Sequence, residues 1–179
     1  MQGTRKTRTR LVVAAAAAGV LLVGGCMNEE DKDINKPLPR MSQKEAEKKA
    51  HSVTQSLTHS AGLEVDEKSI SADYTKCVGA NDEVPEDGRF VLQYGARTPL
   101  AGEKHKYAIQ KMREHLKEIG YKIQGYQETK GVNGSIILDA SDPDSGFTLA
   151  VDGVPKKDEI TLRLVTPCLL PPGAKQQRY

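Results

Sequence analysis

The first clear pattern of apolar residues lies between Ser42 and Gly62 and has the spacing of an α-helix. Its apolar positions would share one helix face: Ala46, Ala50, Val53 and Leu57. Ser42 and Glu45 fit a capping box, in which each side chain accepts a hydrogen bond from the backbone N–H of the other residue. The stretch therefore predicts an amphipathic helix that begins at Ser42 and ends near Gly62.

Residues 103–119 carry the strongest helical pattern in the chain. Their apolar face would hold His105, Ala108, Met112, Leu116 and Ile119, and Gly120 follows as a residue typical of a helix end. Thr98–Pro99 offers an earlier start, with Thr98 as the cap. The polar face mixes acidic residues with basic ones, namely Lys104, Lys106, Lys111, Arg113 and Lys117. Mixed charge is typical of a solvated face, and a patch for lipid head groups is the alternative.

Six stretches alternate apolar and polar residues with the period of a β-strand: 69–78, 89–96, 121–125, 136–140, 147–151 and 160–164. Residues with turn chemistry separate the last four. One face of these strands would bury Ile136, Leu138, Phe147, Leu149, Val151, Ile160, Leu162 and Leu164. The order of elements predicts an α+β fold of two layers, with two helices packed on one face of a mostly antiparallel sheet of about five to six strands.

The first 26 residues follow another pattern. Four basic residues (Arg5, Lys6, Arg8 and Arg10) precede an apolar run from Leu11 to Val23, which is shorter than the roughly 20 residues of a membrane-spanning helix. This arrangement is typical of a secretory signal. Val23-Gly24-Gly25-Cys26 resembles a bacterial lipobox, and the resemblance implies a diacylglyceryl group on the Cys26 sulfur and cleavage before Cys26. An ordinary cleaved signal peptide or an uncleaved N-terminal helix is the alternative.

We therefore expect a chain of four parts: a lipoprotein signal peptide (1–25), a lipidated flexible tether (26–41), a single α+β domain (42–170) and a C-terminal tail (171–179). The tether is polar and proline-bearing, without apolar periodicity. The expected location is the extracytoplasmic face of the cell membrane, with the lipid on Cys26 as the anchor. The chain has 26 basic and 24 acidic residues, and this balance argues against a nucleic-acid partner.

The two remaining cysteines are Cys77 and Cys168. In an exported protein such a pair predicts a disulfide, and two buried thiols or a redox pair are the alternatives. This lone pair around an α+β domain, with Gly120-Tyr121 after the long helix and Thr166-Pro167-Cys168 near the end, resembles small actinobacterial exported lipoproteins of unassigned activity. The resemblance carries over no catalytic residue.

Candidate chemistry is sparse. His51, His59, His105 and His115 lack the spacing of metal ligands, so we predict no metal and no cofactor, and we place His105 at the edge of the core. Three carboxylates cluster with a serine (Asp139, Ser141, Asp142 and Asp144), which fits a calcium site or a hairpin turn. Pro143 and Gly146 favour the turn.

We expect the domain to bind an envelope protein or a small ligand, and we assign no catalytic residue. The alternatives are a hydrolase-like cell-surface enzyme whose site residues converge only in the fold, or a protein inhibitor. A cleft that holds His105 or His115 against a carboxylate would favour the enzyme.

Overall fold

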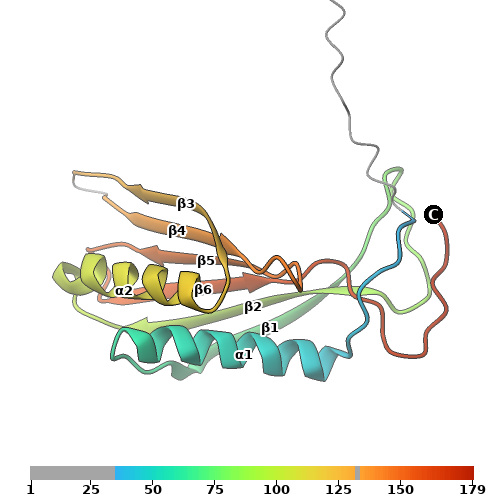
Figure 1. The fold of residues 1–179 in the computed structure, drawn as a ribbon, viewed down its shortest axis with the longest axis horizontal. Coiled ribbons are helices and arrows are strands. Elements are labelled where there is room, and N and C mark those ends of the chain that lie inside the picture. The colour runs from blue at the N-terminus through green and yellow to red at the C-terminus, as the bar shows by residue number, and fades with distance from the viewer. Residues whose placement is uncertain (1–34, 132–133) are drawn as a thin grey trace, which may run out of the picture. The chain divides into compact units, whose positions relative to one another are not determined.

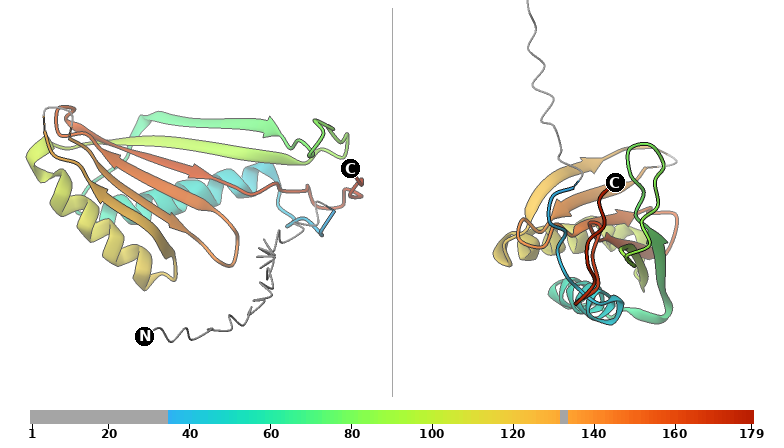
Figure 2. Two further views of the ribbon diagram at one scale, coloured as in Figure 1. Left: turned by 90° about the horizontal axis from the view of Figure 1, so that it is seen from above. Right: turned by 90° about the vertical axis from the view of Figure 1, so that its right-hand side faces the viewer.

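A computed structural model describes residues 35–131 and 134–179. These residues form an open, antiparallel six-stranded sheet with two helices on one face (Figures 1 and 2). In chain order the elements are α1 (Gln43–Ser60), β1 (Asp66–Lys76), β2 (Phe90–Pro99), α2 (His105–Glu118), β3 (Lys122–Glu128), β4 (Ile136–Ser141), β5 (Thr148–Gly153) and β6 (Glu159–Val165). The predicted two-layer α+β fold is confirmed. The signal peptide, the lipobox and Cys26 lie outside the described residues.

The strand order β1-β2-β6-β5-β4-β3 shows how the sheet is assembled. One hairpin (β1–β2) and one meander (β3 to β6) join through an antiparallel pair, in which Tyr94 of β2 lies opposite Leu164 of β6. The connection through α2 leads from the interior strand β2 to the edge strand β3. Both helices therefore lie on the same face of the sheet, where they contact each other.

The helix boundaries follow the predicted caps, with one exception. The N–H of Glu45 donates to Oγ of Ser42 at 3.2 Å, and the N–H of Ser42 donates to Oε2 of Glu45 at 2.9 Å, which confirms the capping box. Gly120 has φ +90° just after α2, as a helix-ending glycine requires. The earlier start at Thr98–Pro99 is wrong, because both residues belong to β2 and Oγ1 of Thr98 donates to the Glu64 carbonyl.

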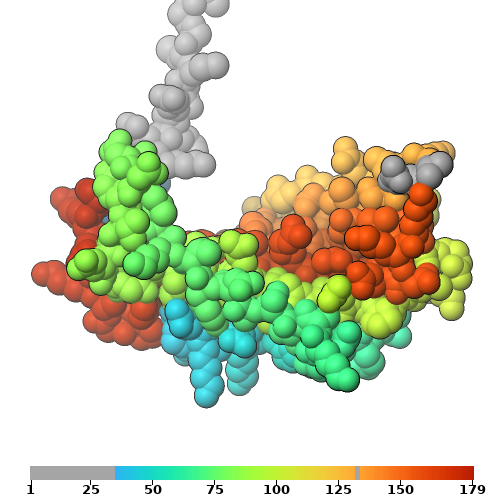
Figure 3. All heavy atoms as spheres, turned by 180° about the vertical axis from the view of Figure 1, so that it is seen from behind, coloured from blue at the N-terminus to red at the C-terminus, as the bar shows by residue number. Residues whose placement is uncertain are grey.

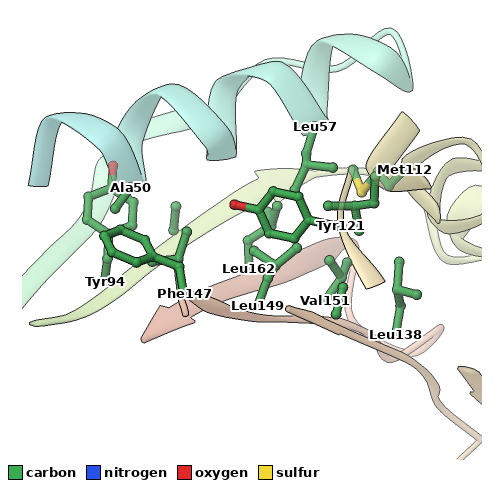
Figure 4. Packing of buried hydrophobic residues seen from close by; sticks show 14 of the residues in the cluster. Ala50, Leu57, Tyr94, Met112, Tyr121, Leu138, Phe147, Leu149, Val151 and Leu162 are labelled. Atoms are coloured by element: carbon green, nitrogen blue, oxygen red, sulfur yellow. The ribbon is translucent and has the colours of Figure 1, made fainter. Parts of the chain in front are cut away.

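The core lies between the helices and the sheet (Figure 4). All eight strand residues predicted to be buried are at most 5% exposed. Leu57 of α1 and Met112 of α2 point toward side chains such as Leu149 and Leu162 of the sheet. The predicted position of His105 at the core edge is wrong. The residue is fully buried, and its Nε2 lies 2.9 Å from the Leu100 carbonyl oxygen.

Cys77 and Cys168 form the predicted disulfide, with their Cα atoms 5.9 Å apart. Cys77 directly follows β1, and Cys168 lies shortly after β6. The bond therefore joins the edge strand β1 to the interior strand β6, across the end of β2 that lies between them in the sheet.

Residues at both ends of the described chain pair with each other, which corrects the expected tether and tail. The N–H of Leu170 donates to the Pro39 carbonyl at 2.9 Å, and the N–H of Met41 donates to the Leu170 carbonyl at 3.1 Å. Figure 2 (right) shows these blue and red segments side by side. Further on, the Gln176 side chain accepts from the N–H of Leu38. Residues 35–41 and 171–179 thus belong to the folded domain.

Candidate functional site

A hollow with a volume of about 780 Å³ lies on the described surface between α1 and α2. We call it the interhelical groove. It is lined by Ser52, Gln55, Ser56, His59 and Ser60 of α1 and by Lys111, Glu114, His115 and Glu118 of α2. The apolar stripe of each helix faces the sheet, so these polar positions on the adjoining faces meet at the surface. Hydroxyls, an amide, imidazoles, an ammonium and carboxylates together offer hydrogen-bond donors and acceptors.

A serine, a histidine and a carboxylate form a chain within this groove. Oγ of Ser56 lies 2.7 Å from Nε2 of His115. Nδ1 of the same ring lies 3.6 Å from Oε2 of Glu118, one turn further along α2. His115 retains 23% side-chain exposure, whereas Glu118 retains 75%. The order of groups is that of an activated nucleophile, a base and an orienting carboxylate.

Acyl transfer also needs hydrogen-bond donors for the developing oxyanion. The residues that line the groove all lie within α1 or α2, beyond the first turn, where backbone N–H groups bond to carbonyls of the preceding turn. Lys111 supplies a cation, and its Nζ lies 3.7 Å from a Glu114 carboxylate oxygen. The described lining residues therefore include a serine paired with a histidine, but none of them directs a free backbone N–H into the groove.

The other three histidines have different partners, and of these three only His59 also lines the groove. Nδ1 of His51 lies 2.8 Å from the Tyr94 hydroxyl. Burial, helped by the charges of Glu67 and Glu47, raises the pKa of Tyr94 to about 12, so that hydroxyl stays protonated. His59 pairs with Glu64 at 3.0 Å, and His105 contacts a backbone carbonyl. His115 and His59 thus both line the groove and both lie against a carboxylate, and the groove is polar. No three His, Cys, Asp or Glu residues of the described chain are grouped to hold a metal ion.

The aspartate cluster forms the turn between β4 and β5. Asp142 accepts from the N–H of Asp144 at 3.0 Å, from the hydroxyl of Ser145 and from Nζ of Lys49 at 3.2 Å. Burial would raise the pKa of Asp142, but these hydrogen bonds outweigh it and lower the pKa. Asp139 belongs to β4 instead, opposite Gly125 of β3. The carboxylates therefore serve separate structural roles.

The basic residues of α2 contact neighbouring groups. Lys106 lies 2.8 Å from Glu128, and the Arg113 guanidinium stacks over the Tyr126 ring at 5.0 Å. These basic side chains already contact acidic and aromatic side chains of the domain. The arrangement therefore favours a solvated helix face over a patch for lipid head groups.

A second candidate functional site lies on the sheet face away from the helices. The exposed Arg163 of β6 lies between Gly95 of β2 and Ala150 of β5, and three shallow hollows adjoin it. Neighbours without long side chains leave room beside the guanidinium. Sequence reasoning missed this arginine because the strand register that surrounds it with small residues is a tertiary feature.

Sequence reasoning also missed Ser56 and Glu118. The spacing of three between His115 and Glu118 was a local signal that could have paired them. No local signal connects Ser56 to His115, because they lie on different helices and meet only through helix packing.

Within the described part of the chain, no helix is both long and apolar enough to cross a bilayer. No protein-family model, curated protein sequence or solved structure matches the chain.

Proposed function

We propose that this protein is an exported lipoprotein, anchored through Cys26 to the extracytoplasmic face of the cell membrane. Its domain binds a polar small ligand or a polar segment of an envelope protein in the interhelical groove. The similarity of Val23-Gly24-Gly25-Cys26 to a lipobox supports the anchor. The Cys77–Cys168 disulfide supports export, because disulfides persist in oxidising compartments and are rare in the cytosol.

The single observation that carries the binding function is the groove itself. It is a concave surface in which donors and acceptors converge from two packed helices, as expected of a site that orients a polar ligand. Both sides of the groove belong to packed helices, so binding a ligand would not cost the entropy of ordering a loop. Because the lining residues aim no free backbone N–H at the groove, the geometry favours binding over catalysis.

In-cell photo-cross-linking tests this function. A photoreactive residue in place of the groove residue Ser52 is expected to capture one discrete envelope component, while the same residue in place of Lys68 on β1 is expected to capture none. Both positions are exposed, but only Ser52 lines the groove. The Cys26→Ser chain should leave the membrane fraction and lose the adduct. Equal adducts from Ser52 and Lys68, or an unchanged membrane fraction, would contradict the proposal.

A hydrolase is the second candidate, because Ser56, His115 and Glu118 are arranged in the order of a nucleophile, its base and a carboxylate. A fluorophosphonate probe distinguishes the two functions by intact mass. We expect the wild-type protein to remain unlabelled, as a binding groove requires. Labelling that disappears in Ser56→Ala and slows at least tenfold in His115→Asn would instead favour the hydrolase.

A further inference from the structure

Three segments meet at one end of the domain: residues 35–41, residues 76–89 and residues 168–179. We call this the terminal end. The disulfide joins residues 76–89 to residues 168–179, and the hydrogen bond from the N–H of Leu170 to the Pro39 carbonyl joins residues 35–41 to the same C-terminal segment. Figure 3 shows the green loop and the red C-terminal segment together at this end. It is therefore a rigid surface built from parts that are distant in the sequence.

Basic residues exceed acidic ones on this surface. Five basic side chains are exposed there: Lys36, Arg40, Lys76, Lys175 and Arg178. Three acidic residues accompany them, namely Asp82, Glu83 and Glu86. The remaining pair, Arg89 and Asp87, is buried with side chains 1% exposed and neutralises itself. The terminal end thus carries a net positive charge, although the chain as a whole is close to neutral.

Two apolar side chains accompany the basic ones. Val78 is 54% exposed and Val84 is 46% exposed, and both lie on the loop that follows β1. Gly79, next to Val78, packs against the Tyr179 ring so closely that a Cβ atom would stand 2.5 Å from it. This contact holds the loop against the C-terminal segment. Exposed apolar residues on a surface with a net positive charge are typical of regions that contact a membrane interface.

The length of the chain limits how far this end can stand from the lipid. Asn35, the first described residue, comes nine residues after Cys26. Nine fully extended residues span at most about 30 Å. Because the expected tether contributes residues 35–41 to the folded domain, the connection to the anchor is short. A lipid on Cys26 would bring the terminal end, rather than any other part of the domain, to the bilayer.

We propose that the terminal end rests on the bilayer surface, with Val78 and Val84 at the interface and the five basic side chains on anionic head groups. This inference rests on the proposed lipid anchor at Cys26. Anionic lipids attract basic residues within about 10 Å of the surface at moderate salt. The contact orients the domain instead of leaving it free to rotate on its tether.

The orientation sets the position of the interhelical groove. α1 begins at Gln43, close to the terminal end, and runs away from it (Figure 1). Ser56 lies fourteen residues after the Ser42 cap, which is about 20 Å along the helix axis. The groove would therefore lie away from the lipid, where components of the envelope can reach it.

Single tryptophans test the contact, because the chain has none of its own. Val84→Trp places the reporter at the terminal end, and Tyr107→Trp places a matched one at a 65% exposed site in the first turn of α2, at the opposite end (Figure 1). Each full-length lipidated protein is reconstituted in vesicles of phosphatidylglycerol and brominated phosphatidylcholine. We expect Val84→Trp to be quenched at least threefold more than Tyr107→Trp, and a Lys175→Glu/Arg178→Glu background to reduce the difference.

Sedimentation with the vesicles separates two kinds of failure. If the lipidated protein sediments, its Cys26→Ser form does not, and both tryptophans are quenched equally, the anchor stands and the terminal contact is overturned. If the Cys26→Ser form sediments as well as the parent, the anchor is wrong and the terminal contact loses its basis with it. The inference is supported only if the lipidated protein sediments, its Cys26→Ser form does not, and Val84→Trp is quenched more strongly than Tyr107→Trp.

Discussion

Removing the Cys77–Cys168 disulfide is expected to lower the free energy of unfolding by about 4–5 kcal/mol, the largest effect that we predict for a covalent change. The bond joins residues 91 positions apart in the sequence. In the chain-entropy model, so long a loop restricts the unfolded chain strongly. The bond also fixes the terminal end, where hydrogen bonds from backbone and side chains connect the first and last described segments.

Urea denaturation of the Cys77→Ser/Cys168→Ser double variant measures this effect. Its midpoint should fall well below that of the oxidised wild-type protein, and reductant should lower the wild-type midpoint in the same direction. The double variant should not respond to reductant, which makes it the matched control. Coincident midpoints for oxidised protein and double variant would contradict the expected stabilisation.

Replacing Arg89 by Met is expected to destabilise the domain by about 3–5 kcal/mol, because it leaves the buried Asp87 carboxylate without its partner. Nε of Arg89 donates to Oδ1 of Asp87 at 2.8 Å, and the N–H of Gln177 donates to Oδ2 of Asp87 at 2.9 Å. The Arg89 guanidinium also lies over the Tyr179 ring at 4.6 Å. One buried ion pair thus holds the C-terminal segment in place.

A double-mutant cycle separates the ion pair from packing. Asp87→Asn/Arg89→Met should cost less than the sum of the two single variants, because it removes both charges together. Thermal denaturation of all four proteins gives the coupling free energy. Strict additivity would show that the two side chains do not stabilise each other.

The same pair makes stability depend on pH. Hydrogen bonds from Arg89 lower the pKa of Asp87 from 3.8 to about 2, although burial opposes them. The folded-state pKa is below the unfolded one, so the stabilisation is fully present above pH 4 and is lost as the pH falls toward 2. The shift is equivalent to roughly 2 kcal/mol. In the cycle, the Asp87→Asn protein should lose less stability than wild type across this range.

Local periodicity was sufficient to predict the helices, the strands and their buried faces. Leu138 and Leu162, for example, alternate with polar residues as a half-buried strand requires, and both are buried. Cysteine count and expected export together predicted the disulfide. The error at Thr98–Pro99 came from a cap motif that fits a strand end equally well. His105 is buried more deeply than expected, since its ring packs against Gly153 of β5, where a Cβ atom would stand 3.2 Å from Nδ1.

The candidate site and the chain ends could not be predicted in the same way. The contact between Ser56 and His115 depends on how two helices pack, and no periodicity contains that information. Residues 35–41 are polar and proline-bearing, which is typical of a linker. Their order comes from hydrogen bonds to the backbone of Leu170 and to the side chain of Gln176, and both depend on the three-dimensional path of the chain.

The adjacency of residues 39–41 and 168–170 has a practical consequence for protein engineering. A fluorescent reporter fused behind Tyr179 would emerge beside the segment that leads to Cys26, where it would crowd the anchor. Inserting the reporter within the chain avoids this conflict and leaves Cys26 directly after its expected signal peptide. The exposed turn at 155–158, between β5 and β6, would carry the reporter at a site that supplies no strand pairing to the sheet.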